Sequence, residues 1–113
     1  MSDQSHEAFD RVFQGKTDDE LIDARADLLQ RAHAVQQHGW GPFQYVWSTG
    51  ESLAVAVLLD DDAVLAEFDE TAESAMERWA FDLWGITGGE ADQQAGLTRT
   101  RRWFNATRTA LIS

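Results

Sequence analysis

Thr71 to Gly85, with the sequence TAESAMERWAFDLWG, carries a helix start, a helix stop and an apolar stripe in one short stretch. Thr71 can act as the N-cap, because its hydroxyl can accept a hydrogen bond from a first-turn N–H. Gly85 can take the left-handed conformation that ends a helix. At ~100° per residue, five apolar side chains fall on one core-facing stripe, namely Ala72, Met76, Trp79, Ala80 and Leu83. The stretch therefore predicts the central helix of a small helical domain.

Two further aromatic residues of this segment, Phe81 and Trp84, lie to the side of the stripe. The apolar arc is thus wider than one core contact needs. Either both rings are covered by another apolar segment, or they form an exposed aromatic surface. In the second case we expect them to bind a partner.

Length and composition indicate one domain that spans residues 1–113, with residues 1–4 flexible. The absence of cysteine excludes disulfides and thiolate metal sites, which fits a reducing, cytoplasmic location. The start of the chain lacks the pattern of a signal peptide. The longest apolar run, residues 53–59, is much shorter than the roughly 20 residues that span a bilayer. We therefore expect no membrane segment.

Capping patterns predict two more helices. Thr17 and Glu20 form a capping box that opens a helix to about His38, just before Gly39. Ser48 and Glu51 form a second box, ahead of the apolar run 53–59. Periodicity alone does not decide whether this run is a buried strand or a buried helix, but the cap favours a helix.

Weaker helical patterns occur at 3–14, at 63–68 and from Thr98 or Thr100 onward. The prediction is an all-α fold, a compact bundle of about five short-to-medium helices. Two segments do not fit a helix. The segment 40–47, WGPFQYVW, is expected either to pack across the helices as a plug or to form an exposed aromatic recognition loop. The segment 86–97, ITGGEADQQAGL, is rich in glycine and polar residues and predicts a mobile loop.

The stretch WSTGESLAVAVLLDDDAVL, residues 47–65, resembles a segment of uncharacterised small proteins of actinobacteria and their phages. The similarity covers less than a fifth of the chain. It implies no activity, ligand or site residue.

The net charge of -11 is unevenly distributed. All 20 acidic residues precede Thr98, and four arginines with no acid follow it. The C-terminal segment is therefore a basic patch on an acidic body. Because phosphate binding depends on clustered Lys and Arg, the overall charge disfavours non-specific binding to nucleic acid or to anionic membranes.

The sequence offers no catalytic, cofactor or metal-binding pattern. His33 and His38 are five residues apart, which places them on different faces of a helix. Asp60, Asp61 and Asp62 lack the alternating ligands, the internal glycine and the closing glutamate of a calcium loop. We therefore expect a protein that is not an enzyme and has neither cofactor nor metal.

The best hypothesis is an intracellular protein–protein interaction or regulatory protein, which could act as a homodimer. Its expected partner-binding residues are aromatic and arginine side chains, namely Phe81, Trp84, Arg99, Arg101, Arg102, Trp103 and Arg108. A competing interpretation is that these arginines dock on the acidic body of the chain itself. The alternative function is related to nucleic acid, either as an acidic DNA mimic that blocks a DNA-binding protein or by contact through the Arg-rich C-terminal helix.

Overall fold

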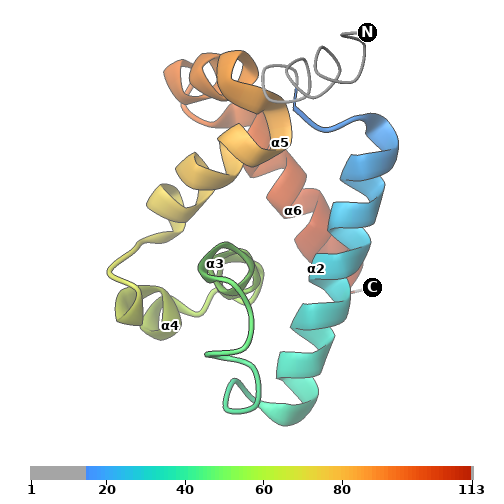
Figure 1. The fold of residues 1–113 in the computed structure, drawn as a ribbon, viewed down its shortest axis with the longest axis vertical. Coiled ribbons are helices and arrows are strands. Elements are labelled where there is room, and N and C mark those ends of the chain that lie inside the picture. The colour runs from blue at the N-terminus through green and yellow to red at the C-terminus, as the bar shows by residue number, and fades with distance from the viewer. Residues whose placement is uncertain (1–14, 113) are drawn as a thin grey trace, which may run out of the picture.

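A computed structural model describes residues 15–112 (Figure 1). Its helices are α2 (Asp18–His38), α3 (Thr49–Leu58), α4 (Asp62–Glu67), α5 (Ala72–Gln94) and α6 (Thr98–Ile112). These residues contain no strand, so the prediction of an all-α fold is confirmed and the alternative of a strand at 53–59 is wrong. No helix within this range has the length and apolar character that a membrane crossing requires. The helix predicted at 3–14 and the flexible residues 1–4 lie outside the described residues.

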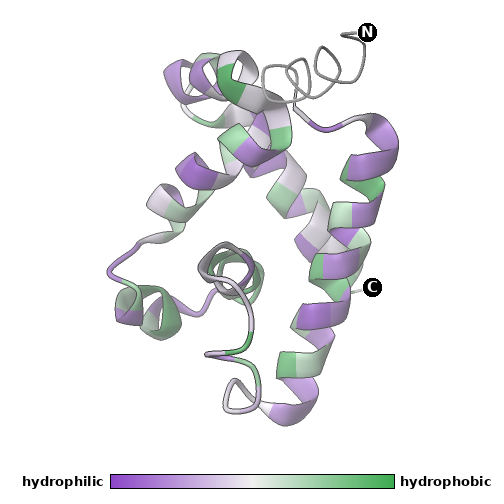
Figure 2. Ribbon diagram, viewed as in Figure 1, coloured by the Kyte–Doolittle hydropathy of each residue, from purple (hydrophilic) through white to green (hydrophobic). Residues whose placement is uncertain are grey.

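Helix α3 is the central element of the bundle (Figure 1). It contacts α2, α4, α5 and α6, and residues 52–58 are all buried. The segment 71–85, predicted to be central, packs on α3 and α6 instead. In Figure 2, α2 and α5 alternate between hydrophilic and hydrophobic residues, as helices with one face toward a core do. A short helix that is apolar on every side is stable only when other helices surround it, which explains the central place of α3.

The predicted helix caps are present. The hydroxyl of Thr17 accepts from the N–H of Glu20, and the carboxylate of Glu20 accepts from the N–H of Thr17. Ser48 and Glu51 repeat this reciprocal pair at the start of α3. Gly39 ends α2 with a φ of 74°. Local capping chemistry thus sets these ends, as the sequence indicates.

Helix α5 bends sharply at Gly85, where φ is 81° and ψ is -178° (Figure 1). Its second half, residues 86–94, folds back on the first, because the side-chain amide of Gln93 donates to the carbonyl oxygen of Glu77 at 3.4 Å. The loop predicted at 86–97 is therefore wrong for residues 86–94, which are helical. Gly89 lies against Phe81, so its missing side chain permits close helix packing.

The aromatic connector 40–47 forms consecutive turns and combines both expectations for it. Trp40, Phe43 and Trp47 pack against the core, and the indole N–H of Trp40 donates to Asp61 Oδ2 at 2.9 Å. Tyr45 and Val46, by contrast, are 89% and 76% exposed. The connector is thus a plug with an exposed tip.

Candidate functional site

A cavity of about 350 Å³ lies between α2, α5 and α6. It gathers four of the predicted binding residues, Trp84, Arg99, Arg102 and Trp103, together with Arg25 and Ala106. We call these six residues the arginine–tryptophan pocket. No carboxylate is among the residues that line it. The pocket is therefore a cationic and aromatic site on an acidic protein.

Trp84 forms one wall of the pocket. It is only 6% exposed, and the guanidinium carbon of Arg99 lies 3.8 Å from its ring centroid. At this distance the guanidinium makes a cation–π contact with the ring. The indole N–H of Trp84 donates to Thr100 Oγ1 at 3.0 Å, which fixes the edge of the ring.

Asp92 holds the start of α6 beneath this wall. Its carboxylate accepts hydrogen bonds from the backbone N–H groups of Arg99, at 2.8 Å, and Thr100, at 2.9 Å. It also accepts from the Thr100 hydroxyl at 2.5 Å. Burial raises the pKa of Asp92, but the hydrogen bonds from Thr100 and Arg99 outweigh this effect and hold the pKa below its ordinary value. The helix N-terminus is thus already occupied by a protein carboxylate, and the charge of the pocket comes from its side chains.

Trp103 forms the opposite wall and is also only 6% exposed. The guanidinium carbon of Arg25 lies 5.3 Å from its ring centroid, and Arg25 Nε donates to Thr107 Oγ1 at 2.8 Å. The sequence analysis missed Arg25, although a signal existed. Arg25 follows Leu21 by four residues and precedes Leu28 by three, so it occupies the core-facing stripe of α2, where a cation is unusual.

The three arginines of the pocket differ from the other cations that the structure describes. Each of the other five has a carboxylate partner within salt-bridge distance, in the pairs Lys16–Asp82, Arg31–Glu51, Arg78–Glu70, Arg101–Glu73 and Arg108–Asp60. Arg25, Arg99 and Arg102 form no salt bridge with any residue between 15 and 112.

The remaining predicted binding residues lie elsewhere. Phe81 is 38% exposed, outside the pocket. Arg101 donates to the carbonyl oxygen of Gly96, and Arg108 donates to the carbonyl oxygens of Val57 and Leu58 at the end of α3. For Arg101 and Arg108, docking within the chain is the interpretation that holds.

The expectation that the aromatic binding residues are exposed is wrong for two of them. Trp84 and Trp103 are buried where α6 packs on the rest of the bundle. The connector 40–47 is not what lies against the edge of Trp84, since its indole N–H meets Thr100 of α6. Both rings nevertheless border the cavity, so burial does not remove them from the site.

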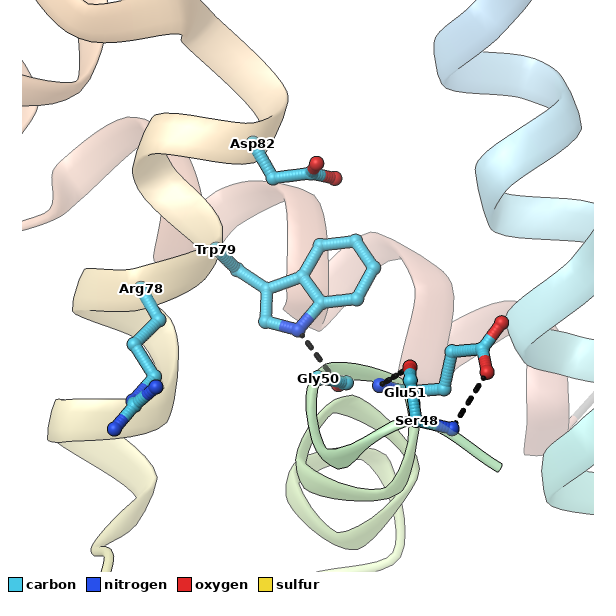
Figure 3. Close-up of a pocket in the computed structure, with 6 residues that line it drawn as sticks. All are labelled: Ser48, Gly50, Glu51, Arg78, Trp79 and Asp82. Atoms are coloured by element: carbon cyan, nitrogen blue, oxygen red, sulfur yellow. Dashed lines mark hydrogen bonds between the residues drawn. The ribbon is translucent and has the colours of Figure 1, made fainter. Parts of the chain in front are cut away.

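A second cavity, of about 370 Å³, lies between α5 and the start of α3 (Figure 3). The indole N–H of Trp79 donates across it to the carbonyl oxygen of Gly50 at 2.9 Å. Its charged lining residues already have partners, because Glu51 pairs with Arg31, Arg78 with Glu70 and Asp82 with Lys16. This cavity therefore offers a ligand much less unpaired charge than the arginine–tryptophan pocket does.

Within residues 15–112 no group of three or more His, Asp or Glu side chains is placed to hold a metal ion. Comparison of the chain with protein-family models, with curated proteins and with solved structures finds no match. The chemistry of the arginine–tryptophan pocket is therefore the guide to function.

Proposed function

We propose that the protein is a cytoplasmic, non-enzymatic interaction or regulatory protein that binds an anionic segment of a partner protein at the arginine–tryptophan pocket. One observation carries the proposal: the three described cations without a carboxylate partner, Arg25, Arg99 and Arg102, all line the same cavity. An anionic group of a partner would supply the missing counter-charge.

The pocket has the composition of an interaction hot spot. Tryptophan and arginine are the residues that most often dominate binding energy at protein interfaces. Guanidinium groups bind carboxylate and phosphate oxygens through paired N–H donors in a fixed planar geometry. A volume of about 350 Å³ is at the small end of ligand pockets, which suits one or two side chains of a partner.

The net charge of -11 would repel an acidic partner at long range. At physiological ionic strength this repulsion is screened beyond roughly 8 Å. The local contacts with the three arginines therefore decide the outcome once the partner arrives. Binding of this kind favours a partner whose anionic group enters the pocket over one that is merely acidic.

The alternative role in nucleic-acid contact has less support. A nucleic-acid reader presents a broad basic face, whereas Arg101 and Arg108 of α6 are engaged with Glu73 and Asp60. The remaining free arginines surround a cavity and do not extend along the helix. A DNA mimic would not need the pocket at all.

The test is partner capture from the native host by crosslinking and affinity purification. The bait proteins are the wild type, the double variant Arg99→Ala/Arg102→Ala, and Arg101→Ala as a control. Arg101 lies on the same helix and carries the same charge but is outside the pocket. We expect a partner that the wild type and the control retain and the double variant loses.

Two results would contradict the proposal. Equal capture by all three proteins would show that the pocket is not the binding surface. Release of the captured partner by competing DNA, with no effect of the double variant, would support the DNA-mimic alternative. Sedimentation of the wild type and the double variant would show whether the partner is a second copy of the chain.

A further inference from the structure

We infer that the anionic group that enters the arginine–tryptophan pocket is a phosphomonoester on an apolar or aromatic body. This inference rests on the proposed function where the ester belongs to a partner protein, but its chemistry can be tested without that partner. The argument depends on the number of free charges, on their free donors and on the walls of the pocket.

The charge of the pocket exceeds that of one carboxylate. Arg25, Arg99 and Arg102 bring three positive charges to a cavity whose lining holds no acid. A carboxylate carries a single negative charge, whereas a phosphomonoester carries nearly two at neutral pH. The more highly charged group offsets more of the mutual repulsion among the three guanidinium groups.

The donors of the pocket also match a phosphate group. Arg25 uses its Nε–H on Thr107, and none of its other guanidinium N–H groups is bound to a described residue. No guanidinium N–H of Arg99 or Arg102 makes a hydrogen bond within residues 15–112. A phosphomonoester presents three strong acceptor oxygens, so each arginine can meet a separate oxygen.

The backbone of α6 does not supply this site. Phosphate often binds the free N–H groups at a helix N-terminus, but here Asp92 accepts from the N–H groups of Arg99 and Thr100. The phosphate must therefore be held by side chains. A planar guanidinium fork is then required, and lysine would replace it poorly.

The walls of the pocket indicate what carries the phosphate. Trp84, Trp103 and Ala106 are mainly apolar, and a cavity of about 350 Å³ holds more than an inorganic ion. An aromatic or aliphatic body beside the tryptophan rings would fill this space and gain from its burial. Free phosphate would leave the apolar walls without a contact.

The test is a titration of the full-length protein with small probes at about pH 8, where a phosphomonoester is fully ionised. Phenyl phosphate and phenyl sulfate have nearly the same shape and differ by one charge. Benzoate tests a carboxylate on the same ring, and inorganic phosphate tests the ion without a body. Binding is measured by calorimetry and by the NMR signals of the indole N–H groups of Trp84 and Trp103.

We expect phenyl phosphate to bind about tenfold more tightly than phenyl sulfate, benzoate or inorganic phosphate, because the extra charge adds charge-assisted hydrogen bonds. Arg99→Ala/Arg102→Ala should lose at least about tenfold in affinity for phenyl phosphate, and Arg101→Ala should not. The indole signals should shift with the wild type and the control only. A peptide that carries phosphotyrosine distinguishes the sources: tighter binding than phenyl phosphate assigns the ester to a partner protein, and equal binding assigns it to a small metabolite.

Equal affinity for phenyl phosphate and benzoate, or no binding of any probe, would overturn this inference. Neither result would affect the proposed function if partner capture still depends on Arg99 and Arg102. Conversely, binding of phenyl phosphate together with capture that ignores the double variant would overturn the proposed function alone. The two conclusions therefore fail on different measurements.

Discussion

The guanidinium carbon of Arg99 lies 3.8 Å from the ring centroid of Trp84, and the two residues are joined a second time through buried hydrogen bonds. The indole N–H of Trp84 donates to Thr100 Oγ1, the Thr100 hydroxyl donates to Asp92 Oδ2, and Asp92 Oδ1 accepts from the backbone N–H of Arg99. The stacked pair thus sits on a closed polar network. Any change in that network should alter both the stability of the fold and the geometry of the pocket.

Thr100→Val tests the middle of this network. Valine has nearly the shape of threonine but leaves the indole N–H of Trp84 and one bond of Asp92 unsatisfied in a buried place. We expect the free energy of unfolding to fall by about 2–3 kcal/mol. Thr100→Ser keeps the hydroxyl and loses one methyl group, so it should cost only about 1 kcal/mol. Urea denaturation followed by circular dichroism measures both, and equal losses would show that the hydroxyl has no special role.

Asp92→Asn tests the charge in the same network through pH. The pKa of Asp92 is lowered in the folded protein from an ordinary value of 3.8. A lowered pKa means that the carboxylate stabilises the fold above its unfolded pKa and loses this effect as the pH falls through the folded pKa. We expect the stability gap between wild type and variant to be widest near neutral pH and to shrink once the pH falls below about 4. A gap that stays constant down to acid pH would contradict the assignment.

Arg108→Ala tests the arginine that the sequence assigns to binding and the structure assigns to the end of α3. Arg108 donates to the carbonyl oxygen of Val57 at 2.7 Å and pairs with Asp60 at 3.3 Å. We expect a loss of about 1–2 kcal/mol in unfolding free energy, with no change in partner capture. The matched control is Arg101→Ala, whose exposed pair with Glu73 should contribute less than about 1 kcal/mol. Similar small losses from both variants would mean that the carbonyl contacts of Arg108 contribute little.

Sequence alone predicts those features that neighbouring residues determine. The capping boxes at Thr17 and Ser48 and the stop at Gly39 need only a few adjacent side chains, and all three are present. The second half of α5 is different, because its glycine-rich composition resembles a loop. Its helical state depends on packing against Phe81, a contact that composition does not reveal.

The candidate site divides in the same way. The cluster of arginines after Thr98 is visible in the sequence, and two of them reach the pocket. The charges of Arg101 and Arg108 look identical in the sequence, but the folded backbone directs them to Glu73 and Asp60. Arg25 joins the pocket from another helix, so only the tertiary structure brings it there.

Gly89→Ala and Gly50→Ala separate close packing from helix propensity. Alanine favours a helix over glycine by up to about 1 kcal/mol, so propensity alone predicts that both variants are more stable. A Cβ at position 89, however, would lie 2.8 Å from Phe81 Cδ1 and 3.0 Å from Phe81 Cα. The second contact involves backbone, so the two halves of α5 would have to separate, and we expect a net loss of about 1–3 kcal/mol. A Cβ at position 50 would meet no atom within 4 Å, so that variant should gain about 0.5–1 kcal/mol. Thermal and urea unfolding measure both changes, and a gain at both positions would show that the two halves of α5 are not held in close contact.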